Sequence, residues 1–166
     1  TTLQTGDGTV VIGKPEGGTY SVPATIRSFP PAITKLPYTF YQYQADLRGL
    51  QPGTEYAHRI MVNGATLTSA PAYFRTAAPG KFSFLAFGDS GENSPEQRAA
   101  IALMIAEPGI SFIMHTGDLA YPEGSFAEYQ TDYFGLNAQL FERLPVFPTP
   151  GNHDYLVDSA APYLAS

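Results

Sequence analysis

The spacing of hydrophobic and polar positions changes about halfway along the chain. In the first half, residues 41–47 alternate apolar with polar side chains, which is typical of a strand with one buried face. Three other short runs are rich in β-branched and aromatic residues, namely residues 9–12, 56–62 and 72–75. Turn sequences such as Asn63-Gly64 separate these runs. Short strands with frequent turns predict a β-sandwich for this half.

One turn in this half is more specific than the others. The segment Leu50-Gln51-Pro52-Gly53-Thr54-Glu55-Tyr56 resembles the corner before the sixth strand of fibronectin type III domains. In that corner a tyrosine hydroxyl bonds to nearby backbone. The alternative is that Tyr56 is an ordinary aromatic residue of the core.

The second half predicts alternating strands and helices after a linker at residues 77–80. A nearly continuous apolar run at residues 81–87 is expected of a strand covered on both faces. The elements that follow are a helix from Ser94 to about Ala106, a strand at 110–115, a helix from Ser125 to about Leu144 and a short strand at 145–148. This order, β-α-β-α-β, predicts parallel strands joined by right-handed crossovers.

Charge is distributed unevenly between the two halves. Residues 1–80 hold six basic and four acidic side chains, whereas residues 81–166 hold three basic and eleven acidic ones, a net charge of −8. An acidic surface argues against nucleic acid as a partner, and it repels phosphate esters unless cations lie within it. No apolar run approaches the roughly 20 residues of a membrane helix. The absence of cysteine excludes disulfides and thiolate metal ligands.

Polar clusters follow each of the three predicted parallel strands. They contain Asp89 after the first strand, Asp118 and Tyr121 after the second, and Asn152 and His153 after the third. The separations of 29 and 34 residues, from Asp89 to Asp118 and from Asp118 to Asn152, each fit one βαβ unit. Because the carboxyl ends of parallel strands share one edge, these side chains are expected to meet there.

Converging carboxylates repel one another unless metal ions neutralise them. Oxygen and imidazole ligands without thiolates suit iron, manganese, zinc or magnesium. A carboxylate can bridge two cations, and such pairs are a recurrent device in phosphoryl hydrolysis. His115 and His58 lie inside predicted strands and are expected to be structural. The segment Asn152-His153-Asp154 taken alone could instead be a helix cap or an Asx-turn.

Three sequence blocks together resemble a known enzyme family. Residues 88–91, 117–121 and 151–154 match the first three blocks (GDxG, GDxxY, GNH[DE]) of purple acid phosphatases, within the calcineurin-like metallophosphoesterases. The resemblance implies two domains, with a fibronectin type III-like β-sandwich at 1–78. Residues 79–166 would then form the βαβαβ start of an α/β metallophosphoesterase domain, which is a four-layer αββα sandwich when complete.

The resemblance also assigns roles to individual residues. Asp89 and Tyr121 would bind the first metal, Asp118 would bridge both metals, and Asn152 would bind the second. His153 would be catalytic, stabilising the transition state or protonating the leaving group. The implied cofactor is a dinuclear centre of Fe(III) with Zn, Mn or Fe(II), because a tyrosinate ligand favours ferric iron. The implied function is an acid phosphatase that hydrolyses phosphate monoesters with a metal-bound hydroxide.

The chain departs from the family pattern in its histidines. The remaining family blocks, a lone His and a later His-x-His, would supply three more ligands, but the chain has only His58, His115 and His153. The resemblance therefore implies a fragment that lacks these distal motifs, and a β-sandwich that lacks its first strands. We expect weak metal binding and little turnover from this polypeptide alone.

Two other functions remain open at the level of sequence. One is a phosphodiesterase or nucleotide-cleaving metallophosphoesterase, and the other is a non-catalytic binding or adhesion module with a degenerate metal site. The resemblance implies a secreted or periplasmic hydrolase that acts on small phosphate esters. From the acidic charge and the lack of a long apolar run we expect no nucleic-acid or membrane partner, and a homodimer is compatible with the sequence. Most acidic residues other than Asp89 and Asp118 are expected to be solubilising surface.

Overall fold

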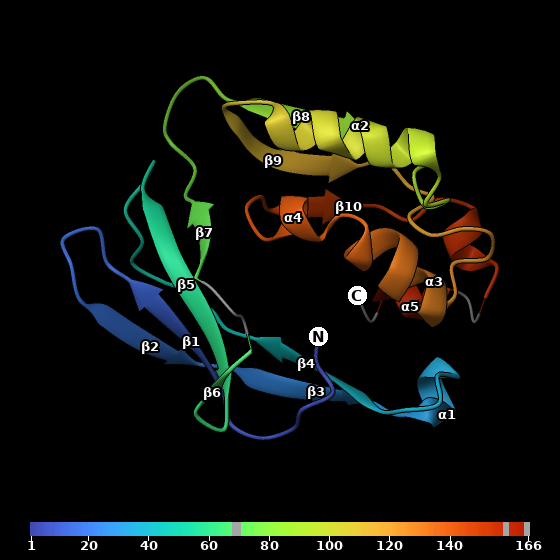
Figure 1. Ribbon diagram of the computed structural model, residues 1–166, viewed down its shortest axis with the longest axis horizontal. Coiled ribbons are helices and arrows are strands. Elements are labelled where there is room, and N and C mark those ends of the chain that lie inside the picture. Colours follow the sequence, from blue (N-terminus) through green and yellow to red (C-terminus); the bar gives the residue numbers. More distant parts are fainter. Residues whose placement is uncertain (68–70, 158–159, 165–166) are drawn as a thin grey trace. The chain divides into compact units, whose positions relative to one another are not determined.

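The computed structural model describes residues 1–67, 71–157 and 160–164. The chain divides into two compact units, Thr1–Gly80 and Lys81–Ser166 (Figure 1). In the part of the chain that is described, no helix has the length and apolar composition that crossing a bilayer requires.

The first unit is built from antiparallel strands. One sheet has the order β2-β1-β5-β6, with β7 also paired to β5, and a second sheet contains β3 and β4. The elements are β1 (Gly8–Gly13), β2 (Thr19–Pro23), β3 (Thr25–Phe29), α1 (Pro31–Thr34), β4 (Phe40–Gln44), β5 (Glu55–Val62), β6 (Ala65–Thr66) and β7 (Ala72–Arg75). The four predicted runs correspond to β1, β4, β5 and β7, although β4 ends at Gln44 rather than at Leu47. Strands β2, β3 and β6 were not predicted.

The turn between β5 and β6 has the backbone that its sequence predicts. Asn63 and Gly64 have φ angles of 50° and 78°. Two successive positive φ values are characteristic of the type I′ turn, whose twist matches that of the strands it joins. Asparagine and glycine tolerate this conformation better than other residues, so the tight hairpin follows directly from the sequence.

The predicted tyrosine corner forms the expected hydrogen bond. The hydroxyl of buried Tyr56 accepts a hydrogen bond from the Gln51 backbone N–H at 2.8 Å. The Tyr56 ring stacks on Phe74 with centroids 5.7 Å apart, and His58 packs edge-on against the same Phe74 ring. His58 therefore belongs to the packing of β5 and β7. Assignment of this unit to the fibronectin type III class stays a prediction.

The second unit contains a three-stranded parallel sheet of order β10-β9-β8. Its elements are β8 (Ser83–Phe87), α2 (Pro95–Ala106), β9 (Ile110–His115), α3 (Phe126–Glu128), the π-helical η1 (Tyr129–Gly135), α4 (Ala138–Phe141), β10 (Val146–Pro148), the 3-10 helix η2 (His153–Tyr155) and α5 (Ala161–Leu164). The predicted strand–helix alternation and parallel pairing are confirmed. Helix α2 begins at the predicted cap, where the Ser94 side chain accepts a hydrogen bond from Gln97 N–H.

One face of this sheet is covered and the other is exposed, so the prediction of a strand buried on both faces is wrong for the described residues. Ile101 of α2, Ile113 of β9 and Leu140 of α4 form one core cluster, and Figure 1 shows α2 lying across β8 and β9. On the opposite face, Phe84 and Phe147 are 44% and 62% exposed. The apolar run misled the prediction because aromatic residues occupy both faces.

The predicted single helix from Ser125 to Leu144 is also wrong in detail. It is divided into α3, the wider π-helical turn η1 and α4. A Cβ atom at Gly135, the last residue of η1, would lie 2.9 Å from the Gln130 carbonyl oxygen. Glycine at this position therefore permits the wide turn. Within η1, Tyr129 and Tyr133 are buried in a cluster with Leu119.

Candidate metal centre

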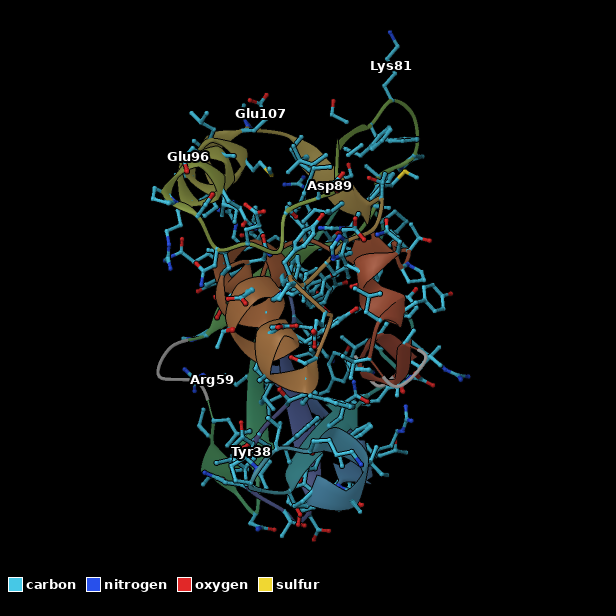
Figure 2. All side chains as sticks on the ribbon, turned by 90° about the vertical axis from the view of Figure 1, so that its right-hand side faces the viewer. Tyr38, Arg59, Lys81, Asp89, Glu96 and Glu107 are labelled. Carbon is cyan, nitrogen blue, oxygen red and sulfur yellow. The ribbon has the colours of Figure 1, made fainter. Side chains whose placement is uncertain are left out.

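The loops after the three parallel strands lie in backbone contact at one edge of the sheet. The Asp89 N–H donates to the Gly117 carbonyl oxygen at 3.0 Å, and the Ser90 N–H donates to the Asp118 carbonyl oxygen at 3.3 Å. Figure 2 marks Asp89 on the loop between β8 and α2. These hydrogen bonds join the first loop to the second, as the spacing of the clusters predicts.

The motif glycines allow the second and third loops to approach each other. Gly117 has a φ of 115°, and a Cβ atom there would lie 2.8 Å from the Cα of Gly151. A Cβ atom at Gly151 would overlap the carboxylate of Asp118. Any larger residue at either position would push the loops apart, so these glycines bring Asp118 next to the Asn152 segment.

Both aspartates of this edge have left-handed backbone conformations, with φ of 51° at Asp89 and 54° at Asp118. Such conformations cost free energy for residues other than glycine, and they cluster at functional sites. The surrounding loop contacts hold the two carboxylates in this arrangement.

The phenol of Tyr121 joins the two carboxylates. Its hydroxyl donates to Asp89 Oδ1 at 2.7 Å and contacts Asp118 Oδ2 at 3.1 Å. Burial raises the pKa of Tyr121 above its ordinary value, and the two carboxylates raise it further. The predicted residues Asp89, Asp118 and Tyr121 are therefore brought together, with the Tyr121 hydroxyl in contact with both carboxylates.

The carboxylate of Asp118 faces two loops. Its Oδ2 contacts Tyr121, while its Oδ1 accepts the backbone N–H of His153 at 2.9 Å. Burial alone would raise the pKa of Asp118, but these hydrogen bonds outweigh burial and leave the pKa below its usual value. Asp118 is thus a buried carboxylate with Oδ2 toward Tyr121 of its own loop and Oδ1 toward the backbone of the third loop.

Asn152 lies between two residues that contact Asp118, namely Gly151 and His153. It is exposed, and its side chain makes no capping hydrogen bond to η2. The helix-cap explanation of this segment is therefore wrong. The place of Asn152 as a metal ligand stays a prediction.

The imidazole of His153 is anchored through one nitrogen. Its Nδ1 lies 2.6 Å from the carbonyl oxygen of Pro122, and because a carbonyl only accepts, Nδ1 carries the proton and donates. The ring packs on Tyr121 with centroids 4.4 Å apart. This arrangement leaves Nε2 for a ligand or substrate, next to the Asp89–Tyr121–Asp118 cluster.

His115 is structural, as the sequence predicts. It is 1% exposed at the end of β9, and its Nδ1 accepts the Gly117 N–H at 3.4 Å. Its Nε2 lies 2.8 Å from Ser90 Oγ and therefore carries the proton in the neutral ring. His115 thus contacts Ser90 of the first loop and Gly117 of the second loop and links the two. No sequence motif indicated this contact of Ser90.

We expect the stability of the metal-free chain to fall as pH drops from 6.5 to 4. Burial lowers the pKa of His115 from 6.5 to about 4, partly opposed by nearby Asp154, Asp89 and Asp118. The unfolded chain therefore takes up this proton first, and the free energy of unfolding decreases by up to about 3 kcal/mol. Urea unfolding followed by helical circular dichroism at stepped pH measures this. His115→Gln should flatten the profile, and a parent profile equally flat would contradict the assignment.

The side chains of this cluster offer oxygen donors, which suit a hard metal ion, rather than the nitrogen donors of a histidine-rich metal site. In residues 1–67, 71–157 and 160–164, no three His, Asp or Glu side chains form a metal-binding group. The cluster instead combines two carboxylates with a phenol, and an amide follows on the third loop. Such oxygen donors suit ferric iron, manganese, magnesium or zinc.

Comparison with known proteins agrees with this arrangement. A model of the calcineurin-like phosphoesterase family matches residues 82–166. Among solved structures, the chain is similar to a purple acid phosphatase from yellow lupin (Lupinus luteus) seeds, with a TM-score of 0.78 and 20% identity. The similarity covers 95% of this chain and 34% of the lupin chain, so this chain spans about a third of that protein's length. At this identity the likeness shows the fold. No curated protein matches the chain.

Proposed function

Because the chain belongs to the calcineurin-like phosphoesterase family, we propose that its second unit hydrolyses phosphate monoesters at a centre for two metal ions. The observation that carries this proposal is the contact of the Tyr121 hydroxyl with both Asp89 and Asp118. A phenol between two carboxylates assembles three anionic or potentially anionic oxygens, and a cation is the natural partner for such a group.

The residues divide between the two ions according to the loops that carry them. Asp89, Asp118 and Tyr121 would hold the first ion, and Asp118 with Asn152 would hold the second. A phenolate ligand favours Fe(III) at the first position, and Zn, Mn or Fe(II) suits the carboxylate and amide of the second. When bound, two such ions neutralise the charge of the phosphate and lower the pKa of water.

His153 supplies proton chemistry beside the ions. Its Nδ1–H is fixed on the Pro122 carbonyl, so the ring keeps its orientation while Nε2 gains or loses a proton. An Nε2–H can donate to a phosphate oxygen or to the oxygen of the departing alcohol. General acid catalysis of this kind contributes about 10²–10⁴ in rate.

The negative net charge of the second half is compatible with binding a phosphate ester only when cations are present. Its net charge of −8 repels a phosphate ester, and metal ions at Asp89 and Asp118 would reverse the local field. The remaining parts of the proposal, a fibronectin type III-like first unit and a location outside the cytoplasm, rest on sequence resemblance. The Tyr56–Gln51 hydrogen bond supports the first of these.

A comparison of monoester and diester substrates tests the proposed function. The chain is loaded with ferric iron and zinc and assayed with nitrophenyl phosphate and with bis(nitrophenyl) phosphate, before and after chelation. Since the chain supplies few ligands, we expect slow hydrolysis that prefers the monoester and disappears on chelation. Preference for the diester would favour a phosphodiesterase. No hydrolysis of either ester by the ion-loaded chain would contradict the proposal and favour a binding module.

A further inference from the structure

Asp154 is a buried carboxylate that the proposed centre does not use as a ligand. It is 0% exposed and accepts hydrogen bonds from three groups. The Leu119 N–H lies 3.2 Å from both of its oxygens, the Tyr129 hydroxyl donates to Oδ1 at 2.8 Å, and the Gly151 N–H donates to Oδ2 at 2.8 Å. A buried charge without such donors would be strongly destabilising.

The two backbone donors come from the two loops that carry different proposed ligands. Leu119 directly follows Asp118, and Gly151 directly precedes Asn152. The Asp154 carboxylate therefore joins the two loops: the Leu119 N–H of the second loop lies 3.2 Å from both of its oxygens, and the Gly151 N–H of its own, third loop donates to Oδ2. Gly124 packs against the backbone of Asp154, where a Cβ would lie 2.8 Å from its Cα, so Asp154 has little freedom to move.

We propose that Asp154 is a positioning residue that sets the separation between Asp118 and Asn152, and thereby the spacing of the two ion positions. This inference rests on the proposed function. Asparagine would not test this, because its single oxygen could still accept both N–H groups: the Leu119 N–H lies 3.2 Å from each carboxylate oxygen and the Gly151 N–H binds Oδ2. Alanine removes every acceptor. With Asp154→Ala, the third loop loses this attachment to the second, while the contact of Tyr121 with Asp89 stays in place.

The hydrogen bond from the His153 N–H to Asp118 Oδ1 reports this separation without involving Asp154. Amide hydrogen exchange of the metal-free chain, followed by nuclear magnetic resonance, measures it. We expect the His153 amide of Asp154→Ala to exchange about tenfold faster than in the parent, relative to amides of β9 such as Ile113. Tyr129→Phe is the matched control, because it removes one donor to Asp154 but leaves both loop contacts. In Tyr129→Phe, the exchange rate of the His153 amide relative to the β9 amides should equal that of the parent.

If Asp154 only stabilised the fold, its substitution would accelerate hydrogen exchange of the His153 amide and of the β9 amides equally, and that result would overturn the inference. If Asp154→Ala does not fold, Asp154→Glu moves both carboxylate oxygens outward by one methylene and should shift the same ratio. An unchanged ratio in that variant would equally overturn the inference. Because the measurement is made without metal or substrate, absence of hydrolysis in the parent would contradict the proposed function and leave this test unaffected.

Discussion

Replacing Asp118 with asparagine should lower affinity for the proposed metal ions by more than about a hundredfold and reduce phosphate ester hydrolysis to background. Partners that only orient a ligand already contribute 10- to 100-fold in metal affinity, and a shared direct ligand contributes more. Oδ1 of Asp118 faces His153 and Oδ2 faces Tyr121, so one substitution weakens both proposed ion positions.

The same substitution should leave the metal-free fold largely intact. The asparagine oxygen can still accept the His153 N–H, and the Tyr121 hydroxyl can still donate to Asp89. We expect the free energy of unfolding to change by about 1–2 kcal/mol at most. Calorimetric titration with zinc and urea unfolding measure the two effects separately.

Glu142→Gln is the matched control for Asp118→Asn, because it removes the same charge from an exposed residue of the same unit. It should bind metal and hydrolyse substrate like the parent. Equal losses in both variants would mean that bulk negative charge, rather than the Asp118 carboxylate, attracts the ions.

The grouping of the site could be predicted because it depends on topology more than on side-chain detail. Separations of 29 and 34 residues between Asp89, Asp118 and Asn152 fit successive βαβ units, and parallel strands end at a common edge. The hydrogen bonds of Tyr121 to Asp89 and Asp118 bear out that grouping for the first two loops. Spacing contains no information about where the Asn152 side chain lies.

The burial of Asp154 could not be read from the sequence. Asp154 is one of eleven acidic residues in a half of net charge −8, and from the sequence it is expected to be a solubilising surface residue. In the structure it is fully buried. Its environment is made by Leu119, Tyr129 and Gly151, which come from three separate segments. A sequence feature that does single out Asp154 is its position at the end of the third polar cluster, directly after Asn152 and His153, which have proposed roles.

The covering of the sheet and the course of the second helix were mispredicted for related reasons. An apolar run reports that residues are hydrophobic, but Phe84 and Phe147 are exposed on a face that no described helix covers. The π-helical turn η1 forms where Tyr129 and Tyr133 pack against Leu119, a contact between distant segments. Local periodicity does not contain such tertiary contacts.

Replacing Tyr121 with phenylalanine should abolish the visible absorbance of the ferric chain. In the parent, the proposed Tyr121 phenolate on Fe(III) would give a charge-transfer band. The Tyr121 hydroxyl lies 2.7 Å from Asp89 Oδ1 and 3.1 Å from Asp118 Oδ2. Phenylalanine keeps the ring that packs on His153 but removes the oxygen ligand. The two carboxylates remain, so some iron should still bind without colour.

Tyr155→Phe provides the control, because Tyr155 is a 57% exposed tyrosine of the neighbouring η2. This substitution removes a tyrosine hydroxyl, as Tyr121→Phe does, but from a residue with no proposed ligand role. Its ferric form should keep the full visible band of the parent. Iron content is determined on the same samples, so that loss of colour is distinguished from loss of metal.

The visible spectrum of these three proteins during ferric titration is therefore the most direct test of a metal centre at Asp89, Asp118 and Tyr121. The account predicts a band that grows with added iron in the parent and in Tyr155→Phe and is absent in Tyr121→Phe. The same band in Tyr121→Phe, or no band in an iron-loaded parent, would contradict it.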